Sequence, residues 1–233
     1  MAPIDPSKSG ALGGALRFFR AWLSNPRLVG AILPSSAALG KAITAEITVV
    51  SAPVIELGPG TGVFTRAMLG RGVPEHKMAL CELEPNFAQR LRLRFPAAQV
   101  VCADAARLRA VELFGGERAG AVLSGLPLLN MPADKVAEIV DGAFRHLRPG
   151  AAFYQFTYGR HCPVPRVILE QLGLKAVRTR RVIANLPPAS VYRISRRQTQ
   201  RTTTRSALLP RRDTARGTSL RMRGLAEVGM DKK

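Results

Sequence analysis

The segment that most constrains this chain is an apolar strand that runs directly into a glycine-rich turn. The strand is apolar except for Glu56, and glycine then recurs at every second position, as Gly58, Gly60 and Gly62. Glycine adopts positive φ angles without steric cost and leaves the main chain bare, so a ligand can lie against such a turn. Residues 63–69 are typical of a helix. The sequence therefore predicts a strand, a ligand-binding turn and a helix.

The residues around the glycines indicate which ligand the turn receives. A dinucleotide-binding turn has the pattern Gly-x-Gly-x-x-Gly, and its helix N-terminus faces a pyrophosphate. This chain has Glu-x-Gly-x-Gly-x-Gly instead. The carboxylate of Glu56 would repel a pyrophosphate but would suit a nearby cation. S-adenosylmethionine carries an ammonium and a sulfonium and no phosphate, so we expect this cofactor, with its methionine part held by Glu56 and the three glycines.

Two more acidic residues follow apolar strands in a consistent arrangement. Glu82 ends the strand at 78–81, about twenty residues after the turn, which is the spacing of a carboxylate that binds ribose hydroxyls. Asp104 follows the strand at 99–103 and is placed to accept a hydrogen bond from an adenine amino group. A glycine turn alone could be an ordinary tight turn. Because three neighbouring strand ends each carry a residue suited to one part of the same cofactor, the sequence favours a cofactor site.

Six further blocks accompany the glycine turn, and their sequences are more specific than the turn. They comprise residues 18–22, 25–27, 30–36, 124–129, 153–159 and 185–192. With the turn, they resemble the class I S-adenosylmethionine-dependent methyltransferases over roughly residues 15–194. Within that class the chain is similar to the branch of the rRNA adenine dimethyltransferases and, more closely, to the small bacterial phospholipid N-methyltransferases. The resemblance implies methylation of phosphatidylethanolamine on nitrogen, once or sequentially to phosphatidylcholine.

The order of the expected elements predicts an α/β fold. Expected helices span residues 37–48 (capped by Ser35 and Ser36), 63–69, 86–95, 132–147 (stopped by residues 148–150) and 164–172. Expected strands span residues 53–57, 78–81, 99–103, 121–124 and 152–157, and a terminal hairpin surrounds Pro187 and Pro188. This alternation gives a mostly parallel, Rossmann-like sheet with helices on both faces and a C-terminal antiparallel hairpin. Ligands of such folds bind at the carboxyl ends of the strands.

Composition agrees with a globular protein. A length of 233 residues and an apolar content of 46% suit one domain with a full core. The three cysteines are odd in number and lack metal-ligand spacing, so we expect a reducing cytosol, Cys81 and Cys102 buried in strands, and no metal. No apolar run approaches the ~20 residues of a membrane span, and the N-terminus lacks a signal-peptide core. We therefore expect a cytoplasmic protein that contacts the inner face of the cell membrane peripherally.

The net charge of +19 is divided unevenly along the chain. Residues 195–233 hold eleven Lys and Arg and three Asp and Glu, so +8 falls there and +11 on residues 1–194. This tail has no aromatic residue and is rich in Arg, Thr and Ser, so we expect it to be disordered. Such a tail binds nucleic acid or an anionic lipid surface, or is solvated without a specific partner, and charge alone does not distinguish these alternatives.

Residues 1–35 are expected to form an amphipathic membrane-binding segment ahead of a methyltransferase domain at 36–194. On a helix, apolar side chains recur on one face, aromatic side chains flank it, and arginines lie opposite. These residues are Leu12, Leu16, Phe19 and Leu23 on the face, Phe18 and Trp22 beside it, and Arg17 and Arg20 opposite. Aromatic side chains would enter the acyl boundary while arginines meet lipid phosphates. A helix packed on its own domain would show the same stripe, so that alternative stays open.

The segment after the fourth strand separates a lipid amine from a nucleobase as substrate. Methyltransferases that act on the amino group of a base usually place Asn or Asp there, followed by an aromatic residue that stacks on the base. The corresponding positions here are Gly125 and Leu128. A lipid amine needs neither group, but it must lose its proton and lie in line with the methyl carbon. The sequence therefore favours a lipid amine over adenine.

Several residues near the end of the fifth strand and in the hairpin are candidates for the substrate. Tyr158 is placed to face the methylated ammonium with its ring and to accept a hydrogen bond with its oxygen, as the catalytic candidate. Arg160 and Arg166 are candidates for the lipid phosphate, His161 for a general base, and Tyr192 for contact with the head group. The plainer alternatives are packing for the tyrosines and solvation for the charged residues.

Two other functions stay open beside the phospholipid N-methyltransferase. An rRNA adenine N6-methyltransferase is supported by the basic charge and by kinship. It is opposed by Gly125 and Leu128, and by the lack of the separate helical domain with which such kin hold RNA. A catalytically inactive basic protein could also keep the fold for RNA or membrane attachment. We take phosphatidylethanolamine and an anionic phospholipid surface as the expected partners.

Overall fold

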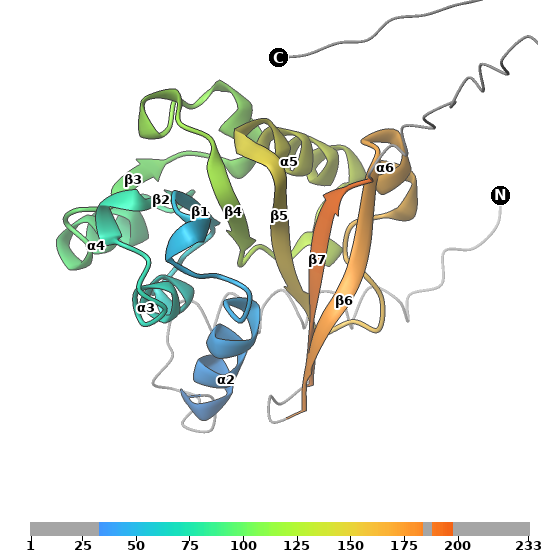
Figure 1. The fold of residues 1–233 in the computed structure, drawn as a ribbon, viewed down its shortest axis with the longest axis horizontal. Helices are drawn as coiled ribbons and strands as arrows, with labels where there is room; N and C mark the ends of the chain where they lie inside the picture. The colour runs from blue at the N-terminus through green and yellow to red at the C-terminus, as the bar shows by residue number, and fades with distance from the viewer. Residues whose placement is uncertain (1–32, 184–187, 198–233) are drawn as a thin grey trace, which may run out of the picture. The chain divides into compact units, whose positions relative to one another are not determined.

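The computed structural model describes residues 33–183 and 188–197, and these form a seven-stranded sheet with helices on both faces (Figure 1). The strands are β1 (Val54–Leu57), β2 (Met78–Glu82), β3 (Gln99–Cys102), β4 (Ala119–Ser124), β5 (Leu147–Thr157), β6 (Leu174–Val182) and β7 (Ala189–Arg196). Their order is β3-β2-β1-β4-β5-β7-β6. Strands β1 to β5 are paired in parallel, and β7 is antiparallel to both β5 and β6. The expected Rossmann-like sheet with a C-terminal antiparallel hairpin is confirmed.

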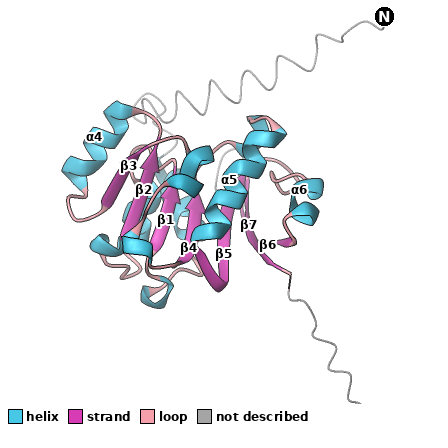
Figure 2. Ribbon diagram, turned by 90° about the horizontal axis from the view of Figure 1, so that it is seen from above, coloured by secondary structure: helices cyan, strands magenta, loops and turns pink. Residues whose placement is uncertain are grey.

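Each face of the sheet has its own apolar core. Helices α2 (Leu33–Ile43), α3 (Val63–Leu69) and α4 (Pro85–Arg94) cover one face, and α5 (Ala133–His146) and α6 (Arg166–Gln171) cover the other. Figure 2 shows α5 in front of β4 and β5. Along β1, Ile55 and Leu57 contribute to the α5 side and Val54 to the α3 side, because successive side chains of a strand point to opposite faces. Each such side chain contributes roughly 1.5–3 kcal/mol on full burial.

The carboxyl ends of three neighbouring strands lie side by side in the sheet. Leu57 at the end of β1 pairs with Cys81 of β2 and with Ser124 at the end of β4. The residues that follow these strands therefore meet at one edge, which is where an open α/β sheet binds its ligand.

Helix α2 differs from its expected limits. It begins at Leu33 and ends at Ile43, so Ser35 and Ser36 lie inside the helix instead of at its start. Its buried residues Leu39 and Ile43 contribute to the α3 side of the core. Packing of this face sustains the helix without the expected cap, since tertiary burial contributes more to helices in proteins than local propensity does.

The junction between α5 and β5 also differs from expectation. Helix α5 runs to His146 and β5 begins at Leu147, so the expected stop at Arg148, Pro149 and Gly150 lies within the strand. The pairing with β4 shifts register there, which accommodates the proline. The guanidinium of Arg148 donates hydrogen bonds to the carbonyl oxygens of Ala52, at 3.0 Å, and of Val50. These contacts span nearly a hundred residues of sequence, so local patterns do not reveal them.

Of the two cysteines expected to be buried, one is buried and the other is exposed. Cys81 is buried in β2, and burial raises the pKa of its thiol to about 12, with further increases from the nearby Glu82 and Asp104 carboxylates. Cys102 is exposed, because β3 is an edge strand of the sheet.

Two expectations fall on parts of the chain outside the described residues. They are the membrane segment with Arg17, Phe18, Phe19, Arg20 and Trp22, and the basic tail from residue 198 onward. Within residues 33–183 and 188–197, no helix has both the length and the apolar character to cross a membrane.

Candidate functional site

The glycine turn after β1 is the centre of the candidate site. Gly58, Gly60 and Gly62 have φ angles of 67°, 53° and 76°, a region that other residues adopt only with strain. Close packing reinforces the requirement, because a Cβ atom on Gly62 would lie 2.6 Å from the ring of Phe95. The three positions therefore need glycine for conformation and, at Gly62, for space.

Glu82 lies beside this turn and holds it. Its Oε2 accepts a hydrogen bond from the amide of Gly60 at 3.0 Å, and its Oε1 accepts one from the amide of Glu84 at 3.0 Å. The residue is buried, with 8% of its surface exposed. Each carboxylate oxygen can accept a second hydrogen bond, so Glu82 retains acceptor capacity for a hydroxyl group of a ligand.

Glu56 is the most unusual group in the site, because it is a fully buried carboxylate. Its Oε2 accepts a hydrogen bond from the hydroxyl of Thr65 on α3 at 2.6 Å. Its Oε1 has no hydrogen-bond partner in the described part of the chain. Burial raises the pKa of Glu56 to about 7, against the lowering effect of the Thr65 hydrogen bond. A cationic ligand beside the free oxygen would stabilise the ionised form.

Asp104 is the third acidic strand end, and both of its oxygens are already engaged. Oδ1 accepts a hydrogen bond from the amide of Ala106 and thereby caps the short helix η3 (Ala105–Ala110). Oδ2 pairs with the ammonium of Lys135 on α5 at 2.7 Å. Partial burial acts to raise the pKa of Asp104, but these hydrogen bonds and the positive charges nearby hold it below its usual value. Asp104 therefore stays ionised and fixes η3 against α5.

The loop after β4 lies tightly against the glycine turn. The amide of Gly125 donates to the carbonyl of Leu57 at 2.8 Å, and a Cβ atom on Gly125 would lie only 2.7 Å from the carbonyl oxygen of Gly58. A side chain at position 125 would displace the turn. Leu128 is buried and contributes to the core on the α5 side.

Gln155 in β5 supports the same loop through hydrogen bonds. It is fully buried, and its Nε2 donates to the carbonyl oxygens of Leu126 at 3.0 Å and Phe156 at 2.8 Å. These two acceptors orient the amide, and Oε1 has no hydrogen-bond partner in the described part of the chain. Gln155 therefore helps to position the loop that borders the glycine turn.

Tyr158 directly follows β5 and is 36% exposed. Its ring packs edge-on against Phe156, with centroids 5.5 Å apart, and Phe156 packs in the same way against Phe64 of α3 at 5.7 Å. Leu129, which is 52% exposed, lies against Gly159, because a Cβ atom on Gly159 would be 2.9 Å from its Cδ1. Tyr158 and Leu129 thus flank the loop at Gly159 as partly exposed apolar groups.

The remaining substrate candidates differ in their surroundings. Tyr192 of β7 is largely buried, and its hydroxyl donates to the carbonyl of Arg160 at 3.2 Å, which ties the hairpin to the loop after β5. The Arg160 side chain is exposed, as is His161. Arg166 pairs with Glu170 on its own helix at 2.7 Å and its side chain is 91% exposed. Such an exposed ion pair contributes little to stability, so a lipid phosphate could replace the Glu170 carboxylate as the partner of Arg166.

Comparisons with known proteins agree with this geometry. The sequence pattern of the methyltransferase domain matches residues 54–150. The ornithine lipid N-methyltransferase of Singulisphaera acidiphila is 31% identical over 134 residues, which make up 55% of this chain and 70% of that protein. The chain belongs to the class I S-adenosylmethionine-dependent methyltransferases. Its cofactor is S-adenosylmethionine.

Solved methyltransferases share the fold at low sequence identity. The glycopeptide N-methyltransferase MtfA, in complex with S-adenosylmethionine, gives a TM-score of 0.55 at 13% identity, over 70% of this chain and 95% of that chain. The 1,6-didemethyltoxoflavin-N1-methyltransferase of Burkholderia thailandensis gives 0.52 at 18% identity, over 84% and 93%. The residues of this methyltransferase suit the cofactor, because bare glycine backbone lies together with a buried Glu56 oxygen that has no partner among the described residues. Across the described residues, no cluster of His, Cys, Asp or Glu could hold a metal ion.

Three residues of the site of this methyltransferase were not predicted from its sequence. Thr65, Lys135 and Gln155 each bind a group at the carboxyl edge of the sheet. Gln155 carried a usable signal, since a polar residue in an otherwise apolar strand is normally buried with a hydrogen-bond partner. Thr65 and Lys135 carried none, because their partners lie nine and thirty-one residues away.

Proposed function

We propose that this methyltransferase methylates the primary amine of phosphatidylethanolamine, once or sequentially to phosphatidylcholine, at a membrane surface. The ornithine lipid N-methyltransferase of Singulisphaera acidiphila is named for a lipid substrate, and it supports methylation of a lipid amine in general. Ornithine lipid is the competing lipid substrate.

The crowding at Gly125 is the observation that best supports a lipid amine, rather than a nucleobase, as the substrate. The carbonyl oxygen of Gly58 leaves no room for the Asn or Asp that would hold an adenine amino group. Leu128, at the position of the stacking aromatic, is buried in the core instead of facing a ligand. An amine on a flexible head group requires neither a clamp nor a stacking surface. It requires a position in line with the methyl carbon and loss of one proton.

The cofactor supplies an activated methyl group, and the residues at the strand ends would orient it. We assign Glu56 and the backbone of Gly58, Gly60 and Gly62 to its methionine part, because the free Glu56 oxygen suits an ammonium. Glu82 has acceptor capacity for the ribose hydroxyls. Asp104 would accept a hydrogen bond from the adenine amino group with its remaining lone pairs.

The substrate would enter beside the loop after β5. Tyr158 presents an aromatic ring and a hydroxyl suited to a methylated ammonium. Arg160 and Arg166 are the proposed contacts for the lipid phosphate, and Tyr192 for the head group, with the hydroxyl of Tyr192 also fixing the Arg160 backbone. Burial of the amine beside these groups favours its neutral form, which is the nucleophile.

The enzyme would work as a cytoplasmic, peripheral protein on the inner face of the cell membrane. In this proposal the segment 1–35 contacts the bilayer, the domain 36–194 carries the chemistry, and the basic tail 195–233 adds attraction to anionic lipid. The strong positive charge supports attraction to such a surface, where each basic residue contributes about 1 kcal/mol.

A label-transfer experiment tests the substrate. Purified protein is incubated with radiolabelled S-adenosylmethionine and separately with vesicles that contain phosphatidylethanolamine, vesicles that contain ornithine lipid, and undermethylated small-subunit rRNA. Label in phosphatidylethanolamine would support the proposal, and the methylated species would show how many groups are added. Label confined to ornithine lipid would correct the substrate, and label in RNA would contradict the argument from Gly125. Transfer to none of them would favour the inactive binding protein.

A further inference from the structure

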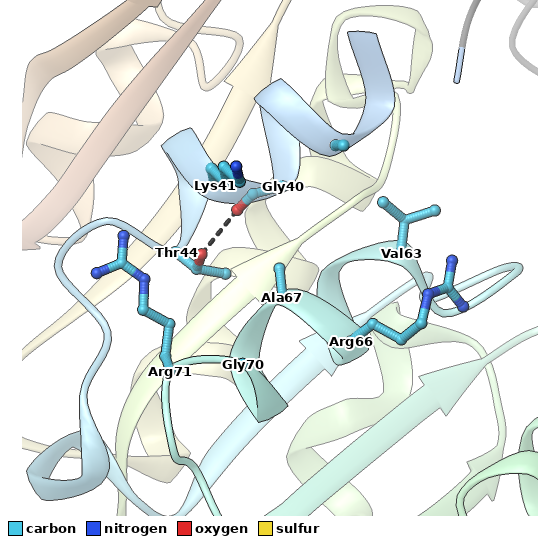
Figure 3. Close-up of a pocket in the computed structure, with 9 residues that line it drawn as sticks. Gly40, Lys41, Thr44, Val63, Arg66, Ala67, Gly70 and Arg71 are labelled. Carbon is cyan, nitrogen blue, oxygen red and sulfur yellow. Dashed lines mark hydrogen bonds between the residues drawn. The ribbon is translucent and has the colours of Figure 1, made fainter. Parts of the chain in front are cut away.

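A basic groove lies between α2 and α3, on the helical layer that is opposite α5. It has a volume of about 690 Å³, and we call it the α2–α3 groove. Its floor includes Gly40, Val63 and Ala67, and its rim carries Lys41, Arg66 and Arg71. Figure 3 shows Arg66 on α3 and Arg71 just after the end of that helix, with Lys41 on α2. None of the acidic strand ends Glu56, Glu82 and Asp104 lines it.

The floor of the groove is apolar and closely packed. A Cβ atom on Gly40 would lie 3.4 Å from Cβ of Ala67, so the two helices approach each other through small residues. The hydroxyl of Thr44 donates to the carbonyl of Gly40 at 2.7 Å, which satisfies the main polar group of the floor (Figure 3). The floor therefore offers carbon surface and no aromatic ring on which a nucleobase could stack.

The rim carries three positive charges that form no ion pair with the described residues. Lys41, Arg66 and Arg71 are exposed, and none of the ion pairs formed within residues 33–183 and 188–197 involves them. Arg66 instead donates to the carbonyl of Thr61 at 3.1 Å. Partial burial and the nearby Arg94 charge lower the pKa of Arg66 from its usual value, against the raising effect of the Glu56 carboxylate, so a further anion beside Arg66 would be favourable.

We propose that the α2–α3 groove binds the glycerophosphate region of an anionic membrane phospholipid and thereby docks the enzyme on the bilayer, apart from the site of methyl transfer. This inference rests on the proposed function, in which the enzyme works at a lipid surface. Charges spread along the rim suit an extended array of lipid phosphates better than one small anion. The apolar floor suits the glycerol and the first acyl carbons. Helix α2, one wall of the groove, begins at Leu33, within the segment expected to contact membranes.

Vesicle binding by a charge-neutralised groove tests the proposal. Lys41→Gln and Arg71→Gln are combined in the full chain, and Arg66 is retained because it binds the glycine turn. The matched control, Arg90→Gln with Lys175→Gln, removes one Arg and one Lys from exposed positions on α4 and β6. Sedimentation is measured with phosphatidylcholine vesicles that contain phosphatidylglycerol. We expect the groove variant to bind roughly tenfold or more weakly than wild type, and the control to bind much more tightly than the groove variant.

Methyl transfer provides the second measurement. On vesicles the groove variant should show a raised KM with an unchanged kcat, and on monomeric short-chain phosphatidylethanolamine it should match wild type. Equal vesicle binding by the groove and control variants would overturn the proposal, as would selective loss of single-stranded RNA binding with vesicle binding retained. If wild type methylates no lipid, the proposed function fails, whereas the sedimentation result still decides whether the groove binds anionic lipid.

Discussion

At the scale of single residues, a buried carboxylate dominates the site. Glu56 is removed from water, and Thr65 provides one hydrogen bond to only one of its two oxygens. A buried charge without full compensation is costly, and proteins retain such groups chiefly where a ligand uses them. The cost to the free protein and the attraction for a cationic cofactor have the same origin.

Glu56→Gln should separate these two effects. The pKa of Glu56 is about 7 when folded and 4.5 ordinarily, so its contribution to stability is present in full below about pH 4.5 and is lost as the pH rises through 7. The loss is on the order of 3 kcal/mol. The variant should have a higher Tm than wild type at pH 8, a flatter pH dependence and weaker cofactor binding. Exposed Glu112→Gln should keep the wild-type slope, and an identical slope in Glu56→Gln would contradict the assigned pKa.

Tyr158→Phe tests the proposed role of a single hydroxyl. If this oxygen orients the amine, turnover should fall by roughly tenfold, the equivalent of one hydrogen bond, while the dissociation constant for the cofactor stays unchanged. Tyr154→Phe is the control, because the Tyr154 hydroxyl bonds Glu46 at 3.0 Å and takes no part in the proposed chemistry. Wild-type turnover in Tyr158→Phe would remove this oxygen from the mechanism.

At the scale of elements, contacts between distant segments set the limits of helices and strands. Arg148 links the start of β5 to the segment before β1 through the carbonyl oxygens of Val50 and Ala52. Asp104 and Lys135 link η3 to α5 at 2.7 Å. The Asp104–Lys135 link lies at the carboxyl edge, where it helps to position the loops that bind the cofactor, whereas the Arg148 link secures the opposite edge of the sheet.

Arg148→Ala should destabilise the fold without changing the site. It removes two charge-assisted hydrogen bonds to carbonyl oxygens, so the free energy of unfolding should fall by about 2–4 kcal/mol, as measured by urea denaturation. Arg145→Ala removes an exposed pair with Asp141 in the last turns of α5 and should cost below about 0.5 kcal/mol. Similar losses for the two variants would mean that Arg148 does not secure the junction.

At the scale of the whole molecule, charge is the property that bears on where the enzyme works. The net charge of +19 favours attraction to any polyanionic surface, and salt within the physiological range screens such attraction. Strand β6, at the edge of the sheet, carries Lys175, Arg178, Arg180 and Arg181 as exposed residues. Charged side chains on an edge strand also discourage pairing with another chain.

Phe19→Ser combined with Trp22→Ser tests the expected membrane segment. Loss of both aromatic side chains removes apolar surface that would enter the acyl boundary, so vesicle sedimentation should be abolished while cofactor affinity persists. Leu209→Ser with Ala207→Ser, in the basic tail, serves as a control for a general loss of apolar residues. Unchanged sedimentation of the Phe19 and Trp22 variant would favour a helix packed on its own domain.

Local sequence patterns determined the strand, glycine turn and helix at 54–69, the alternation of elements and the terminal hairpin. Backbone conformation and apolar periodicity act over a few residues, so a sequence displays them directly. The acidic strand ends were visible for the same reason. The limits of α2 and β5 were predicted wrongly, because packing at Leu39 and the hydrogen bonds of Arg148 override local signals.

Only the tertiary structure decided the chemistry of those residues. The pKa of Glu56 depends on burial and on Thr65, the exclusion of a side chain at Gly125 depends on Gly58, and the α2–α3 groove depends on how two helices approach at Gly40. Each property arises between groups that the chain separates and the fold brings together. Desolvation and steric contact act through space, so neither can be read from the order of residues alone.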